Sequence, residues 1–188
     1  MTALRPVSDD RVAVDLDGER WRVVPAEAVH RAGLAVGCEL DRQSARTLRG
    51  ELRRAEARRA ALSALRHRDH STVTLRAQLE RQGIARLDRD AALELVQRAG
   101  FVDDERFAHR RAAALAERGC GDLLVADDLE RRGLPAELVA AALAALEPEA
   151  ERAARLVAAH GATTKTLRRL AAKGFATDVL EGLVADAG

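Results

Sequence analysis

Three segments of the chain end in the same pattern, and this repeat constrains the fold more than any other feature. In each segment a leucine stands four residues before a glycine, and a large apolar residue follows the glycine; the three glycines are Gly83, Gly133 and Gly174. Glycine adopts the left-handed conformation that ends a helix without a steric penalty, and the next apolar side chain packs back on the last turn. We therefore expect a helix to stop at each glycine. The glycines lie 50 and 41 residues apart, which is in the range of helical repeat arrays.

Helical patterns before and after each of these segments make the repeat unit three helices. The sequence therefore predicts an all-α fold in which three tandem three-helix modules form an elongated array. We expect these modules over residues 42–100, 101–147 and 148–188. An array of this kind presents long surfaces, and it suits binding better than enclosing an active site.

Residues 1–41 predict a small N-terminal β-hairpin and a short helix. Apolar and polar residues alternate on both sides of Asp17-Gly18, a dipeptide typical of a type I′ turn. Because a lone two-stranded hairpin is only marginally stable, it should pack on another element, and we expect Trp21 to be its anchor. A short helix over 25–32 follows.

One long helix is expected from Arg42 to about His67. Its predicted buried stripe consists of Ala45, Leu48, Leu52, Ala55 and Leu62. Four arginines occupy a separate face that spans about 60° of the helical wheel; they are Arg42, Arg46, Arg49 and Arg53. Arg59 falls within the apolar stripe, where only the snorkelling of its long stem would account for it.

The composition favours thin layers of helices in a cytoplasmic protein. Hydrophobic residues make up 47% of the 188 residues but aromatic residues only 2%, so the core must consist of leucine, valine and alanine. No apolar run reaches the roughly 20 residues that span a bilayer, and the first residues lack the apolar stretch of a secretory signal. Cys38 and Cys120 stand far apart without metal-type partners. We expect reduced thiols, with a disulfide as the open alternative.

The formal net charge of +1 conceals two basic blocks. Between Arg42 and His70 there are nine arginines against three acidic residues, and between Arg152 and Thr177 there are six cationic residues and no acid. The remainder of the chain is therefore acidic. This segregation predicts an anionic partner that is met by particular elements. The alternative, that either block is an ordinary solvated helix face, stays open.

No pattern of catalytic, cofactor-binding or metal-ligating residues stands out, so we expect no enzyme, no cofactor and no metal site. His67 and His70 have no obvious third ligand, and a basic solvated turn is favoured over a metal site. For Asp103-Asp104-Glu105, a helix N-terminus with Asp103 as its cap is favoured over a cation site or a partner contact. The serine, cysteine and histidine residues show no nucleophile–base motif, and no glycine-rich phosphate loop is present.

Five motifs occur in a characteristic order from the middle of the chain onwards. They are Ala61–Ser71, Leu75-Arg-Ala-Gln-Leu-Glu-Arg-Gln-Gly83, Gly100-Phe-Val-Asp-Asp-Glu-Arg-Phe-Ala108, Leu129-Glu-Arg-Arg-Gly-Leu134 and Lys173-Gly-Phe175. In this order they resemble the RecX family of bacterial proteins that act on the RecA recombinase. The resemblance covers roughly residues 55–188, and the chain departs from the family in having no tyrosine.

The resemblance implies a protein of tandem three-helix modules that binds the groove of the RecA–DNA filament. It implies that the protein modulates, mostly by inhibition, the ATPase and strand-exchange activities of RecA in recombination, DNA repair and the SOS response. It also implies no catalytic residues and no cofactor. We expect a monomer that does not associate with membranes.

The predicted partner-binding residues follow from charge. They are Arg42, Arg46, Arg49, Arg53, Arg66, Arg68, Lys165, Arg168, Arg169 and Lys173. The competing hypothesis is a helical protein that binds DNA non-specifically and acts without the recombinase, because non-specific phosphate contact needs only exposed cations. Sequence-specific recognition is not expected, because the helices that follow the glycine turns are apolar or acidic.

Overall fold

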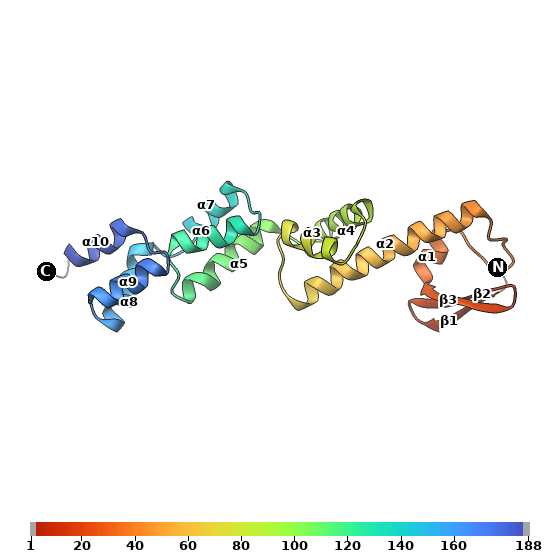
Figure 1. Cartoon of the computed structure of the whole chain (residues 1–188), viewed down its shortest axis with the longest axis horizontal. Coiled ribbons are helices and arrows are strands. Elements are labelled where there is room, and N and C mark those ends of the chain that lie inside the picture. Colours follow the sequence, from red (N-terminus) through yellow and green to blue (C-terminus); the bar gives the residue numbers. More distant parts are fainter. Residues whose placement is uncertain (1–2, 186–188) are drawn as a thin grey trace. The chain divides into compact units, whose positions relative to one another are not determined.

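A computed structural model of the chain describes residues 3–185 (Figure 1). The chain divides into two compact units. Unit 1 comprises Met1–Arg68 and Leu75–Ala99, and unit 2 comprises Asp69–Thr74 and Gly100–Gly188. Within residues 3–185, no helix is both long enough and apolar enough to cross a membrane.

Unit 1 begins with a three-stranded antiparallel sheet in the order β1-β2-β3. The strands are β1 (Ala3–Ser8), β2 (Arg11–Leu16) and β3 (Glu19–Pro25). The predicted hairpin is confirmed as β2 and β3, and its turn residues Asp17 and Gly18 have φ values of 51° and 88°, as a type I′ turn requires. Strand β1 is an addition to the predicted hairpin, and its sequence lacks the alternation that identifies a strand.

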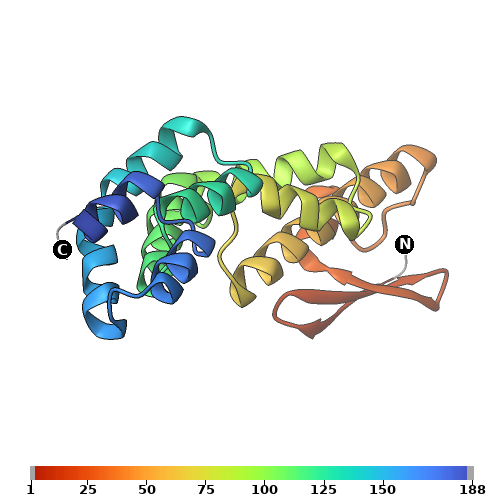
Figure 2. The same cartoon turned by 60° about the vertical axis from the view of Figure 1, so that its left-hand side comes forward.

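The sheet packs through valines, and Trp21 is not its anchor. Val14 and Val24 are buried in a cluster with Val29 of α1 (Ala26–Arg31) and Leu48 of α2 (Arg42–His67). Figures 1 and 2 show both helices on one side of the strands. The pairing shifts by one residue between Val14 and Asp15, so Trp21 forms a β-bulge and remains 44% exposed. The predicted anchoring role of Trp21 is therefore wrong, because a bulge re-aims the side chain that it contains.

Helix α2 buries two different faces along its length. Leu48 is buried in the first half, and Ala57 and Ala61 are buried in the second. Ala57 lies about 180° around the helix axis from Leu48, and α2 contacts both α1 and α4. The single predicted stripe is therefore wrong in its second half, where Leu62 is 39% exposed. Arg59 is exposed as well, so it needs no special account.

The remaining helices are short and follow one another through tight turns. Unit 1 contains α3 (Thr72–Arg81), whose first turn belongs to unit 2, and α4 (Arg86–Arg98). Unit 2 contains α5 (Asp104–Glu117), α6 (Asp122–Arg131), α7 (Ala136–Ala144), α8 (Glu149–His160), α9 (Thr164–Ala172) and α10 (Thr177–Ala185). Helices α5–α7 share one core cluster and α8–α10 share another. The three-helix architecture predicted from the repeat is therefore confirmed.

The three predicted helix stops are all present. Gly83, Gly133 and Gly174 have φ values of 75°, 75° and 83°. In each case the backbone N–H of the apolar residue after the glycine donates to the carbonyl of the leucine five residues earlier, at 3.1, 3.3 and 3.2 Å respectively. This is the hydrogen bond of a Schellman helix end.

Within unit 2, residues at the start of one helix also form hydrogen bonds with carbonyls at the end of another. The N–H groups of Gly121 and Leu123, at the start of α6, donate to the carbonyls of Lys173 and Gly174 at the end of α9, at 2.9 and 3.1 Å. In the same way, the Ser71 hydroxyl, which caps α3, donates to the Arg132 carbonyl at the end of α6 at 2.7 Å. Backbone groups that an isolated helix would leave unpaired are thereby satisfied within the protein.

Candidate partner-binding surfaces

The arginines at the start of α2 form the first candidate surface. Asp41 caps the helix by accepting a hydrogen bond from the Ser44 backbone N–H at 2.7 Å, which lowers the pKa of the Asp41 carboxyl. Residues four apart on a helix lie on one face, so the predicted row of four arginines is exposed along α2.

The fourth arginine of that row is not a free cation. Arg53 Nε lies 3.2 Å from Asp88 Oδ2 of α4. By contrast, Arg42, Arg46 and Arg49 form no ion pair with any carboxylate in residues 3–185. We name these three the α2 row. The α2 row lies at the start of the first helix of the first three-helix group and gives unit 1 an exposed cationic stripe.

Arg66 and Arg68 lie at the carboxyl end of α2. Arg66 is exposed in the last turn, and Arg68 is the extended residue that follows the helix. A cation there is stabilised by the helix dipole. These two residues therefore have a local structural role irrespective of any partner.

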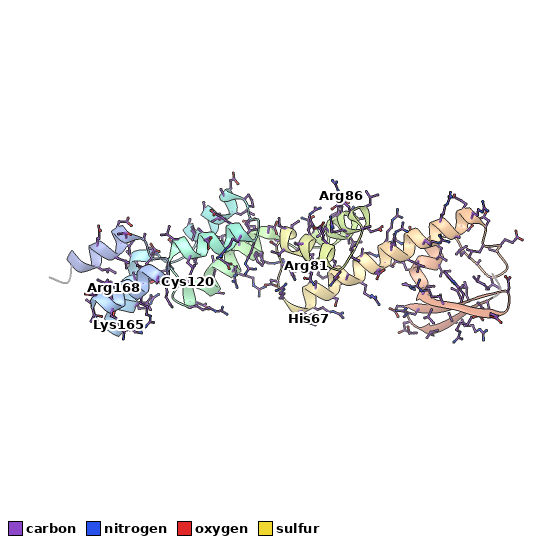
Figure 3. All side chains as sticks on the ribbon, viewed as in Figure 1. His67, Arg81, Arg86, Cys120, Lys165 and Arg168 are labelled. Atoms are coloured by element: carbon purple, nitrogen blue, oxygen red, sulfur yellow. The ribbon has the colours of Figure 1, made fainter. Side chains whose placement is uncertain are left out.

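Helix α9 carries the second candidate surface. Thr163 caps it by accepting a hydrogen bond from the Thr166 N–H at 3.2 Å, and Leu170 is buried on its inner side. The opposite side of the helix carries three exposed cations, which together span an arc of about 100°. They are Lys165, Arg168 and Arg169. No carboxylate in residues 3–185 pairs with any of them. We name these three residues, two of which are labelled in Figure 3, the α9 face.

Lys173 differs from the other predicted cations of this region. Its Nζ donates to the carbonyl of Arg118, at the end of α5, at 2.8 Å. The ammonium group thus satisfies a carbonyl that the end of α5 leaves open. Its role in the structure is to join α9 to α5.

The rest of the second basic block is also neutralised within the protein. Arg152 is buried, donates to the carbonyls of Glu147 and Cys120 at 2.9 Å each, and pairs with the Asp122 carboxylate. Arg155 makes two hydrogen bonds to Glu147, both at 2.7 Å, which lower the pKa of Glu147 and raise that of Arg155. The acids that pair with Arg152 and Arg155 lie outside the block in the sequence, so the count of charges along the chain overestimates the number of free cations in it.

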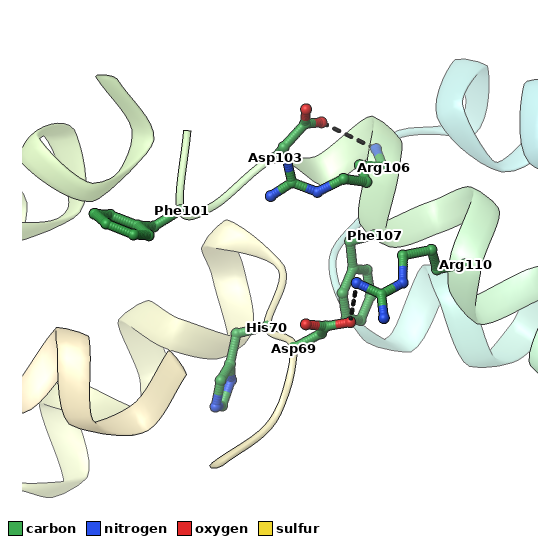
Figure 4. Close-up of a pocket in the computed structure, with 7 residues that line it drawn as sticks. All are labelled: Asp69, His70, Phe101, Asp103, Arg106, Phe107 and Arg110. Carbon is green, nitrogen blue, oxygen red and sulfur yellow. Dashed lines mark hydrogen bonds and ion pairs between the residues drawn. The ribbon is translucent and has the colours of Figure 1, made fainter. Parts of the chain in front are cut away.

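The acidic cluster at the start of α5 is a capping device, as predicted. Asp103 accepts a hydrogen bond from the Arg106 backbone N–H at 2.9 Å. Asp104 accepts one from the backbone N–H of Thr72, the first residue of α3, at 2.7 Å. Figure 4 shows the Asp103 bond beside a shallow hollow, in which Asp69 pairs with Arg110 at 3.2 Å.

The two histidines of the predicted basic turn have different surroundings. His67 is exposed, whereas His70 is buried with its Nδ1 atom 3.3 Å from Thr74 Oγ1. Across residues 3–185, no group of three histidine, cysteine, aspartate or glutamate side chains is placed to hold a metal ion.

A charged cluster that the sequence did not reveal joins α5 to α6. Asp128 accepts two hydrogen bonds from Arg111, at 2.8 and 2.9 Å, and two from Arg132, at 2.8 and 3.3 Å. Arg111 holds the pKa of Asp128 far below its usual range, and Asp128 raises the pKa of Arg111 in turn. Because the two helices are separate in the sequence, only the fold brings this pair together.

Comparison with known proteins gives one consistent family. Residues 103–143 match the family model described as RecX, second three-helix domain. The chain is 32% identical over 139 residues to the regulatory protein RecX of Trichlorobacter lovleyi, covering 66% of this chain and 90% of the relative. It is 35% identical over 127 residues to that of Xanthomonas axonopodis pv. citri, covering 65% and 78%.

Solved structures show the same fold. A crystal structure of regulatory protein RecX superposes with a TM-score of 0.80 over 98% of both chains at 18% identity. The RecX structure from Lactobacillus salivarius superposes with a TM-score of 0.62 over 71% of this chain and 96% of that one, at 14% identity. Together with the family model and the sequence relatives, this fold shows that the chain belongs to the RecX family of regulatory proteins.

Proposed function

We propose that this protein is a non-enzymatic regulator of the RecA recombinase. It binds in the groove of the RecA–DNA filament, bridges neighbouring protomers and lowers ATP hydrolysis and strand exchange. Membership in the RecX family supports the choice of partner. We further propose that it acts as a monomer in the cytoplasm, without a cofactor.

The exposed, unpaired cations of the α9 face are the observation that best supports this binding mode. Several arginines of unit 2 form ion pairs with acidic side chains, for example Arg111 with Asp128 and Arg155 with Glu147. The three cations of the α9 face have no such neighbour in the described part of unit 2. Unpaired charges that protrude from a rigid helix favour contact with an anionic surface. We infer that the α9 face meets acidic protomer surface or DNA phosphate within the filament, and that the α2 row adds a second contact.

The competing function is non-specific DNA binding without the recombinase. The same exposed cations favour it, because phosphate contact requires no further chemistry. Several phosphate contacts would give strong binding to bare DNA that falls by orders of magnitude as salt rises. The two hypotheses therefore differ in which target the protein prefers at physiological salt.

A comparison of two affinities separates them. Binding of the full chain is measured to RecA filaments assembled on single-stranded DNA and to the same DNA without RecA, at about 150 mM salt. Our proposal expects much tighter binding to the filament. Equal affinity for the two targets would favour the DNA-binding hypothesis and refute ours.

A further inference from the structure

Phe101 is an exposed aromatic residue that the core of unit 2 does not use. It lies in the connection between α4 and α5 and is 58% exposed. The next residue, Val102, is only 5% exposed, so this connection does bury one apolar side chain. Aromatic side chains dominate the energetics of cores and of interfaces. A phenylalanine that the core leaves in solvent is therefore a candidate interface residue.

The corresponding connection before α8 has the opposite arrangement. Asp104 and Glu149 begin α5 and α8, and the residues three places before them are Phe101 and Leu146. Leu146 packs against the core of α5–α7, whereas the next residue, Glu147, is exposed. The repeat can thus turn the apolar residue of this position inward. The outward placement of Phe101 is not a requirement of the helical fold.

Phe101 lines the shallow hollow shown in Figure 4. The other residues that line it are Asp69, His70, Asp103, Arg106, Phe107 and Arg110. All of them belong to unit 2, so the hollow is a surface of one compact unit. Its empty space is about 240 Å³ with the open mouth included, which is less than the roughly 300–1,000 Å³ of small-molecule sites. The hollow therefore suits one side chain of a partner better than a free ligand.

The charges around the hollow are of both signs. Asp69 pairs with Arg110 at 3.2 Å, and Asp103 accepts a hydrogen bond from the Arg106 backbone N–H at 2.9 Å. The Arg106 guanidinium donates to the Gly100 carbonyl at 2.9 Å and forms no ion pair with any carboxylate in residues 3–185. The acids repel the phosphates of a nucleic acid, whereas Arg106 is available to a single carboxylate. An aromatic residue with a polar rim is typical of a protein–protein contact.

We propose that this hollow is a protein-binding surface that docks on a protomer of the recombinase filament. An apolar side chain of the protomer packs on Phe101, and a carboxylate beside it pairs with Arg106. The inference rests on the proposed function for the identity of the partner. It goes beyond that function because it assigns a contact to protein rather than to DNA, and to residues outside the α2 row and the α9 face.

A photocrosslinker at Phe101 tests which molecule covers this side chain. Phe101→p-benzoylphenylalanine keeps an aromatic group at the position and, on irradiation, bonds to C–H groups within its reach. The full chain with this substitution is irradiated with RecA filaments assembled on single-stranded DNA. We expect a crosslink to RecA. The matched control is Leu123→p-benzoylphenylalanine, at an apolar residue of unit 2 that is 62% exposed and does not line the hollow, and it should give much less of this product.

Substitutions test whether the contact contributes to affinity. Phe101→Ser should weaken filament binding at least about tenfold, because truncating an aromatic anchor removes a typical hot spot, whereas Phe101→Leu should retain most of the affinity. The loss in Phe101→Ser should be equal at low and high salt, because the contact is apolar. Arg106→Gln should make binding less sensitive to salt. Leu123→Ser should bind as the parent does, and circular dichroism checks that each variant is folded.

Four results would overturn the proposal. They are a crosslink from position 101 to DNA alone, no more RecA crosslinking at position 101 than at position 123, equal affinities of Phe101→Ser and the parent, and an unchanged salt dependence in Arg106→Gln. In each case the parent still binds the filament, so the proposed function of the α9 face stands. A parent that does not bind the filament would overturn both.

Discussion

Glu149 Oε1 accepts a hydrogen bond from the backbone N–H of Asp122 at 2.6 Å. Glu149 is the first residue of α8 and Asp122 is the first residue of α6. Asp104, the first residue of α5, makes the same bond to Thr72, the first residue of α3. Within unit 2, each group of three helices thus begins with an acid that caps the second helix of the group before it. Each bond satisfies a backbone N–H group in the first turn of a helix, which has no partner within that helix.

Replacing Glu149 with alanine should destabilise unit 2 by about 1–2 kcal/mol. The loss exceeds that of one cap, because Glu149 Oε2 also accepts a hydrogen bond from the Ala176 N–H at 3.2 Å. The matched control is Glu151→Ala, which removes an exposed acid from the same first turn. Chemical denaturation of both variants measures the difference. An equal loss in the two would show that only the helix dipole is affected and that the cap contributes nothing.

Gly133→Ala should cost more than a left-handed backbone alone explains. A Cβ at Gly133, where φ is +75°, would lie 2.7 Å from the side chain of Val73. Gly100 has a φ of +71° but open space around it, so Gly100→Ala should cost about 1 kcal/mol and Gly133→Ala about 3 kcal/mol. The free energies of unfolding give the comparison, and Val73→Ala should recover part of the Gly133→Ala loss. Equal costs at the two glycines would mean that the end of α6 does not approach α3 closely.

The Asp128 cluster should make stability depend on pH in the acid range. Hydrogen bonds from Arg111 and Arg132 lower the pKa of Asp128 in the folded state, whereas in the unfolded chain it is about 3.9. The unfolded chain therefore takes up this proton first, so the stabilisation is complete well above pH 4 and is lost as the pH falls below it. Asp128→Asn should cost about 2 kcal/mol at pH 7. The difference from the parent should shrink between about pH 4 and pH 2. A difference that is independent of pH would contradict the assignment.

The helix ends could be predicted from the sequence because each depends only on residues that are close together along the chain. The stops at Gly83, Gly133 and Gly174 and the Asp103 cap all involve groups within a few positions of one another. The hairpin turn is local in the same sense. These signals were sufficient to predict three-helix groups and the strands on either side of the turn.

The failures have a common physical origin in contacts between distant residues. Arg53 and Asp88 are 35 positions apart, and the acids that neutralise Arg152 and Arg155 precede their block in the sequence. Charge counted along the chain therefore overestimated the number of free cations. Trp21 was misplaced because a one-residue bulge changes which side chains reach the core. The single stripe of α2 failed because its two halves pack on different partners.

The α2 row should contribute to binding without contributing to stability. Changing Arg42, Arg46 and Arg49 to glutamate should alter the free energy of unfolding by no more than about 0.5 kcal/mol per site, because these side chains are exposed and form no ion pair in residues 3–185. The variant should bind the filament more weakly than the parent, and added salt should affect it less. Salt titrations of both proteins measure this. Identical salt dependence would show that the α2 row is solvated surface.

The central claim is that the α9 face contacts the recombinase filament. Lys165→Glu, Arg168→Glu and Arg169→Glu are combined in one variant, which should fold because all three side chains are exposed. The control reverses the same number of charges at Arg86, Arg98 and Arg131, exposed arginines that already pair with an acid four residues away.

The decisive measurement is the rate of ATP hydrolysis by the cognate RecA on single-stranded DNA as each protein is titrated in. The account predicts that the parent and the control lower the rate at similar concentrations, and that the α9 variant requires at least about tenfold more. An α9 variant that is folded and suppresses hydrolysis at the parental concentration would contradict it and would place the binding surface elsewhere.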